Sequence, residues 1–86
     1  MYAIQFTQRG ERELISLPRE IQRRIQKKLR ENAALSDPLI RARPLTDLPP
    51  TTHRYRIGKY RVSFYLEGGI IFIERVELRG QAYRHR

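Results

Sequence analysis

Arginines are the residues of this chain whose type and spacing suggest chemistry. Arg54, Arg56 and Arg61 lie close together, and Arg79 precedes Tyr83 by four positions near the C-terminus. A guanidinium group stays charged and carries its donors in a planar fork, which suits the binding of phosphate. An aromatic ring among basic residues can stack on a nucleobase. The set therefore indicates contact with a nucleic acid.

Several other kinds of reactive site are excluded by composition. The chain has no cysteine, which rules out disulfides, cysteine-based zinc sites and thiol nucleophiles. Its two histidines, His53 and His85, lack the spacing of metal ligands, so we expect no metal and no cofactor. RNA can still be cleaved, because its own 2′-OH is the nucleophile and the protein need only move protons and neutralise charge. The close acidic pairs are interpreted as surface charges: Glu11 with Glu13, and Glu74 with Glu77.

The overall charge agrees with a polyanionic partner. The 86 residues include 18 Lys and Arg against 9 Asp and Glu, a formal net charge of +9. Such a field attracts nucleic acid. The length allows one domain, residues 1–86, whose small core would gain stability from a bound partner protein. We see no signal peptide and no membrane-length apolar run, and the lack of cysteine fits a reducing compartment, so we expect a cytoplasmic protein without membrane contact.

Apolar periodicity predicts one strand and two helices in the first half of the chain. Tyr2–Phe6 alternates apolar and polar side chains, as in a half-buried strand. Thr7 can cap a first helix, which Pro18 ends. Apolar side chains then recur every fourth position in a second helix, expected from Arg19 to about Leu35. Residues 39–52 are interrupted by prolines and are predicted to form an irregular loop.

The second half predicts three strands joined by tight turns. The strands are His53–Ile57, Tyr60–Leu66 and Ile70–Leu78, and the turns are Gly58-Lys59 and Gly68-Gly69. These strands form an antiparallel meander, and the N-terminal strand is expected at the sheet edge or beside the last strand. The predicted fold class is therefore α+β with the order β-α-α-β-β-β, an antiparallel sheet and both N-terminal helices packed on one face.

Strand alternation predicts where the arginines point. Arg54 and Arg56 alternate with apolar residues in one strand, and Arg61 alternates with apolar residues in the next. Because the apolar face must pack on the helices, the three arginines are left on the open face of the sheet. Like charges on one surface repel, and an anionic ligand would relieve the repulsion. The alternative is that the guanidinium groups face water or pair with nearby carboxylates, those of Glu67, Glu74 or Glu77.

The order of elements and several short stretches resemble the RelE/ParE toxin superfamily. The strongest match runs from Arg54 to Val62 (RYRIGKYRV) and resembles the family's Arg-x-Arg-x-Gly-x-Tyr-Arg-Val. Leu17-Pro18 resembles the break between the paired helices, and Leu35–Pro38 resembles the end of the second helix. Arg79 and Tyr83 resemble a closing Arg-x-x-x-Tyr. The similarity extends over nearly the whole chain.

The resemblance implies a toxin that a cognate antitoxin neutralises. RelE-type members enter the ribosomal A site and cut the mRNA there, so the ribosome and mRNA are the implied partners. By position, Arg61 would lie against the scissile phosphate and Arg79 would stabilise the transition state. Tyr83 would orient the nucleotide or act as an acid or base. The implied RNA-binding residues are Arg54, Arg56 and Lys59.

The resemblance leaves two alternatives and one gap. A ParE-type member would inhibit DNA gyrase by binding, without catalysis, and the joint presence of Arg61, Arg79 and Tyr83 favours the nuclease over it. The other alternative is an inactive RNA-binding homologue. Some family members have a histidine immediately before the C-terminal arginine, where this chain has Leu78. The general base therefore stays open between Tyr83 and Glu77.

Overall fold

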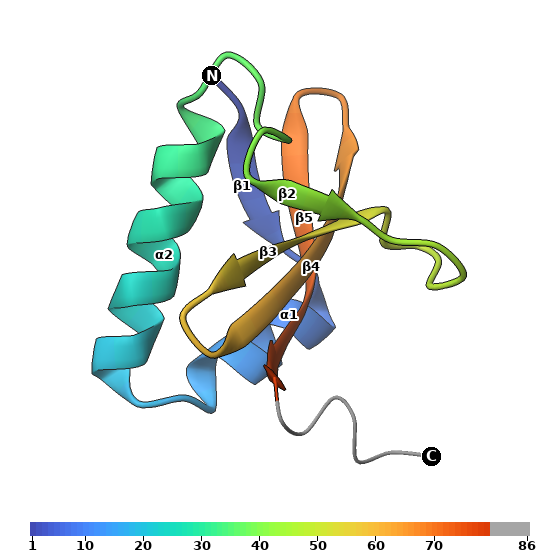
Figure 1. The fold of residues 1–86 in the computed structure, drawn as a ribbon. Coiled ribbons are helices and arrows are strands. Elements are labelled where there is room, and N and C mark those ends of the chain that lie inside the picture. The colour runs from blue at the N-terminus through green and yellow to red at the C-terminus, as the bar shows by residue number, and fades with distance from the viewer. Residues whose placement is uncertain (80–86) are drawn as a thin grey trace.

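The structure of the chain, a computed structural model, describes residues 1–79 and is shown in Figure 1. Its elements are β1 (Ala3–Phe6), α1 (Gln8–Ile15), α2 (Arg19–Ala33), β2 (Ala42–Pro44), β3 (His53–Ile57), β4 (Tyr60–Glu67) and β5 (Ile70–Leu78). All the predicted helices and strands are present, with ends close to those expected. The prediction of an irregular loop over residues 39–52 was wrong for β2, because a strand this short carries no periodic signal.

The five strands form one sheet in the order β1-β5-β4-β3-β2. The meander of β3, β4 and β5 is confirmed, and β1 lies beside the last strand as expected. β1 runs parallel to β5, with Ala3 opposite Ile70, so the sheet is mixed and the expectation of a wholly antiparallel sheet is corrected. At the other edge, β2 pairs with β3 and places Arg43 opposite Arg54.

The core lies between α2 and one face of the sheet. Ile25 and Leu29 of α2 are fully buried in one cluster with Val62 and Phe64 of β4. The regular four-residue spacing of the α2 side chains explains why this helix presents one continuous apolar stripe to the strands. The opposite face of the sheet is left without a covering helix within residues 1–79.

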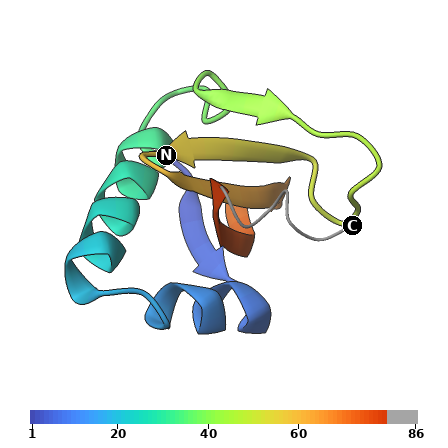
Figure 2. The same cartoon turned by 60° about the horizontal axis from the view of Figure 1, so that its bottom comes forward.

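The helix α1 lies along the edge of β5, where β1 has ended. Thr7 caps α1 by accepting the N–H of Gly10 at 3.1 Å, and its own N–H donates to the carbonyl of Ile73 at 2.9 Å. Gly10 approaches the same carbonyl so closely that a Cβ atom would collide with it. α1 therefore reaches the core only through Leu14, which refines the expectation that both helices pack on one face. In Figure 2, α1 lies at one end of the sheet and β2 at the other.

Tyr55 of β3 joins the core to the loop that follows α2. Its ring stacks on Phe64 with centroids 4.4 Å apart, and its hydroxyl donates to the carbonyl of Pro38 at 2.6 Å. Burial, together with a smaller contribution from the charge of Asp37, raises the pKa of Tyr55 from 10.0 to about 12. The neutral phenol is thus favoured by the folded state.

This raised pKa predicts a loss of stability in alkali. Between about pH 10 and 12 the unfolded chain releases the Tyr55 proton while the folded chain keeps it, so the free energy of unfolding falls as pH rises, by up to about 3 kcal/mol. Tyr55→Phe should lose about 1 kcal/mol at pH 7, with its hydrogen bond, and show a shallower alkaline decline. Urea unfolding at neutral and alkaline pH measures both effects. Parallel declines in the two proteins would contradict this account.

Candidate functional site

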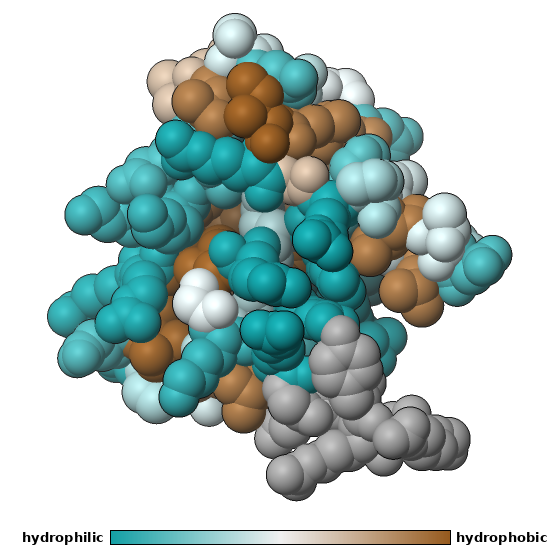
Figure 3. Space-filling view, viewed as in Figure 1, coloured by the Kyte–Doolittle hydropathy of each residue, from teal (hydrophilic) through white to brown (hydrophobic). Residues whose placement is uncertain are grey.

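Three neighbouring strands place arginines on the open face of the sheet. Arg43 lies opposite Arg54 between β2 and β3, and Arg56 lies opposite Arg61 between β3 and β4. Their neighbours in β3 and β4 are buried in the core, which confirms the prediction from strand alternation. Figure 3 shows hydrophilic side chains gathered over the centre of this face. Because like charges directly opposite one another destabilise a strand pair, a bound anion would stabilise this arrangement.

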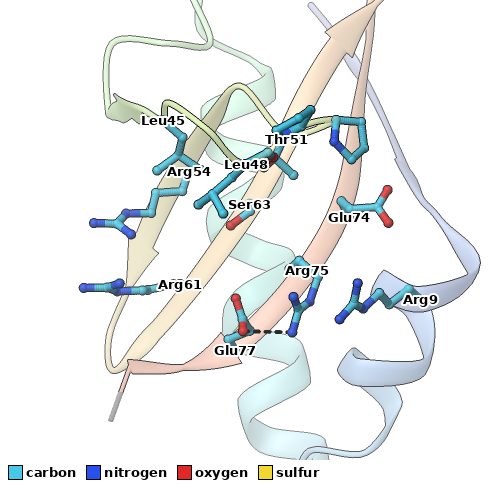
Figure 4. Close-up of a pocket in the computed structure, with 12 residues that line it drawn as sticks. Arg9, Leu45, Leu48, Thr51, Arg54, Arg61, Ser63, Glu74, Arg75 and Glu77 are labelled. Carbon is cyan, nitrogen blue, oxygen red and sulfur yellow. Dashed lines mark hydrogen bonds and ion pairs between the residues drawn. The ribbon is translucent and has the colours of Figure 1, made fainter. Parts of the chain in front are cut away.

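A cleft of about 300 Å³ opens on this face, between β4, β5 and the loop that follows β2. Figure 4 shows the side chains of Arg54 and Arg61 running side by side and away from β5, on which Arg75 and Glu77 lie. Ser63 of β4 also lines the cleft and is 7% exposed. The charged lining residues are four arginines and two glutamates: Arg9, Arg54, Arg61, Arg75, Glu74 and Glu77. An anion that enters the cleft therefore meets a net positive charge.

Arg61 has an unusual environment for a charged side chain. It is only 7% exposed, although it lies on the cleft side of the sheet and outside the core. Burial lowers the pKa of its guanidinium, and the charges of three further arginines lower it more: Arg54, Arg79 and Arg56. The charge of Glu77 acts in the opposite direction. A phosphate near Arg61 would offset the repulsion, because an opposite charge favours the charged form of an ionisable group.

Arg75, in contrast, is held by two carboxylates. Its Nε donates to both oxygens of Glu13 at 3.3 and 3.2 Å, and its Nη2 donates to Oε2 of Glu77 at 2.8 Å. Glu13 also accepts the backbone N–H of Val76 at 2.7 Å, so it covers the edge of β5 beyond the end of β1. The interpretation of Glu13 as a surface charge was therefore wrong. The positive charge of the open face is concentrated on β2, β3 and β4.

The contacts of Glu13 predict a large contribution to stability. Glu13→Ala should lower the free energy of unfolding by about 2–3 kcal/mol, because hydrogen bonds to a charged group contribute about 1.5–3 kcal/mol. Glu13→Gln keeps an acceptor for the N–H of Val76 and should lose less. Glu11→Ala, on the exposed side of the same helix, is the matched control and should lose at most about 1 kcal/mol. Equal losses for Glu11→Ala and Glu13→Ala in urea unfolding would show that the edge contact is unimportant.

The structure brings part of the predicted set together. Arg54 and Arg61 line the cleft. Arg56 lies opposite Arg61 but is exposed and is not part of the cleft lining. Arg79 is exposed just after β5, where its N–H donates to the carbonyl of Lys59 at 2.7 Å. Tyr83 lies outside the described residues.

Lys59 does not lie beside the cleft arginines. It is exposed in the turn between β3 and β4 and does not line the cleft. The backbone bond to Arg79 nevertheless brings the end of β5 to this turn.

Two basic residues of the cleft were missed by the sequence analysis. Arg75 was overlooked because strict alternation from Ile71 and Ile73 would place it in the core. An irregularity in the pairing of β4 with β5 shifts the register, so that Val76 is buried and Arg75 faces outward. Arg9 was overlooked because nothing in the sequence shows that α1 lies beside β5.

The four arginines that line the cleft favour an anionic ligand over a metal cation. Within residues 1–79, no group of three or more His, Asp or Glu side chains is arranged to hold a metal ion. The described part of the chain also contains no helix long and apolar enough to cross a membrane.

Comparison with known proteins gives one family and several similar structures. A family model described as the ParE toxin of the type II toxin–antitoxin system parDE matches residues 4–83. No curated protein sequence matches significantly. The chain is similar to one in the toxin–antitoxin complex RelBE2 from Mycobacterium tuberculosis, with 26% identity and a TM-score of 0.78 over 91% of each chain. It is also similar to a chain of the archaeal RelE–RelB complex from Pyrococcus horikoshii, with 24% identity and a TM-score of 0.71 over 93% of this chain and 97% of the other.

Proposed function

The chain belongs to the ParE toxin family of type II toxin–antitoxin systems, and from this premise we propose that it cleaves mRNA in the ribosomal A site without a metal. The observation that carries the proposal is Arg61, which is 7% exposed and yet lines the arginine-rich cleft. Exposed charge is sufficient to bind a polyanion. A phosphorane-like transition state gains most from charge that is held in place and shielded from water.

The proposed reaction is a transesterification within the RNA. The 2′-oxygen attacks the adjacent phosphorus, the bond from phosphorus to the 5′-oxygen breaks, and the products are a 2′,3′-cyclic phosphate and a 5′-hydroxyl. Arg61 and Arg79 neutralise the charge that develops on the phosphoryl oxygens. Glu77 takes the proton of the 2′-OH, and Tyr83 orients the nucleotide and protonates the leaving 5′-oxygen.

Glu77 is favoured as the base by its position in the cleft. It lies directly opposite Arg61 in the pairing of β4 with β5, and it lines the same cleft. Its ion pair with Arg75 engages Oε2, which fixes the carboxylate and leaves the second oxygen available to accept a proton. Glu77 and Arg61 are thus placed to act on the same phosphodiester.

A cognate antitoxin is part of the proposed function. The similar structures are toxin–antitoxin complexes, and the open face of this chain carries arginines that a partner would cover. We propose that the antitoxin occludes this face in the cytoplasm and thereby blocks the cleft. A purified complex with Arg54 and Arg61 still accessible to RNA would contradict direct occlusion.

The second candidate is binding to DNA gyrase, which the ParE description of the matching family model favours. A gyrase inhibitor needs a docking surface and no general base. The two functions are distinguished by primer extension on mRNA from a translating extract, alongside supercoiling by purified gyrase. We expect cuts at fixed codon positions and unchanged supercoiling. Inhibited supercoiling with intact mRNA would overturn the nuclease.

A further inference from the structure

A second basic cavity lies beside the cleft, on the β2 side of the open face. It has a volume of about 250 Å³, and no carboxylate of residues 1–79 lines it. Its charged lining consists of four arginines: Arg41, Arg43, Arg54 and Arg56. Three of them are exposed and Arg54 is half-buried. None of these four arginines forms an ion pair with an acidic residue in the described part of the chain.

The fold holds these arginines in place on neighbouring strands. Pairing of β2 with β3 sets Arg43 opposite Arg54, on strands about 4.8 Å apart. Arg41 donates from Nη1 to Oδ1 of Asn32 at 3.4 Å, and Asn32 is buried on α2. The short strand β2 thus brings two basic residues up to those of β3, in an arrangement that a bound anion would stabilise.

Arg54 connects the second cavity to the cleft, because it lines both. A ligand that is held in the cleft and extends along the open face toward β2 therefore passes Arg54 and reaches Arg43. We propose that the second cavity binds a backbone phosphate of a single-stranded RNA whose neighbouring nucleotide occupies the cleft. The inference rests on the proposed function, since that strand is the one cleaved beside Arg61.

A nucleic acid strand fits this cavity better than an acidic peptide. A polynucleotide carries one phosphate on every nucleotide, so occupation of the cleft places further phosphates nearby on both sides. Guanidinium groups bind phosphate oxygens bidentately, and several of them converge here. Ile40 lies in the same lining and is 66% exposed, which offers apolar contact to a sugar or base.

The test compares the salt dependence of binding for two uncleavable probes. Each is a fluorescent 2′-O-methyl RNA, one of about ten nucleotides, within the usual range of single-strand sites, and one a dinucleotide. Arg43→Ala should reduce the slope of log affinity against log salt by about 0.7 for the long probe, which is one phosphate contact. It should leave the dinucleotide unchanged. Arg23→Ala removes an exposed charge on α2, outside both cavities, and should leave both slopes as in the wild type.

Three results would overturn the inference. The first is an unchanged salt slope for the long probe in Arg43→Ala. The second is a reduction of the slope that is as large for the dinucleotide as for the long probe. The third is a reduction in Arg23→Ala that is as large as in Arg43→Ala. Arg43-dependent binding of a polyglutamate peptide, with no Arg43 dependence for RNA, would instead assign the cavity to an acidic protein segment. Cleavage in a translating extract is measured in parallel. Absence of cleavage by the wild type would refute the proposed nuclease, while the Arg43-dependent slope would still establish a phosphate subsite.

Discussion

Arg61→Ala is expected to lower the rate of mRNA cleavage by about 100- to 1000-fold, as for the loss of one pre-organised donor to a transition-state anion. Binding of an uncleavable RNA should weaken far less, because Arg54 and Arg75 still line the cleft. Single-turnover cleavage of ribosome-bound mRNA and equilibrium binding of the probe separate the two effects. Arg61→Lys, which keeps the charge and loses the planar fork, should recover only part of the rate.

The fold should survive this substitution. The pKa of Arg61 is lowered by burial and by neighbouring arginines, so its charge costs more free energy in the folded state than in the unfolded chain. Removing that charge relieves the repulsion, while loss of the side-chain stem removes packing. We therefore expect the melting temperature of Arg61→Ala to stay close to that of the wild type. A folded Arg61→Ala that cuts mRNA at the rate of Arg23→Ala would exclude Arg61 from the chemistry.

The sequence was informative about this site where the strands are regular. In β3 and in the first half of β4, polar side chains alternate with apolar ones, and one face must meet α2. Those two conditions determine which side Arg54 and Arg61 occupy. The same argument fails in β5, because the register shift opposite Ser63 and Phe64 moves Arg75 from the expected core face to the cleft. A one-residue shift of this kind reverses every side chain beyond it.

Other parts of the site depend on contacts between distant residues. Gly10 packs against the carbonyl of Ile73, and this close approach lets α1 lie at the edge of β5. Glu13 then reaches Arg75 and Val76, more than sixty positions away in the sequence. The strand β2 could not be predicted either, because three residues that end in Pro44 show no recognisable strand pattern. The periodicity of the sequence predicted the overall fold. It did not predict the side of the cleft that β5 forms, where arginine and glutamate side chains lie together.

Glu77→Gln is expected to have the second large effect on the rate of mRNA cleavage, because it removes the proposed general base. Loss of a general base lowers a rate by about 100- to 10,000-fold, and we expect a loss in this range. Glutamine keeps the size of the side chain and a carbonyl oxygen for Nη2 of Arg75, so the stability of the fold should change little. Single-turnover cleavage of ribosome-bound mRNA by Glu77→Gln and by the wild type measures this loss.

Tyr83→Phe tests the alternative that Tyr83, and not Glu77, is the general base. Phenylalanine keeps the ring that would stack on a base and removes only the hydroxyl. Because Tyr83 is proposed to protonate the leaving 5′-oxygen, Tyr83→Phe should also lower the rate, and Glu77→Gln should lower it independently. A large loss in Tyr83→Phe alone, with Glu77→Gln near wild type, would transfer the role of base to Tyr83. The role of Glu77 would then be confined to its ion pair with Arg75 at the cleft wall.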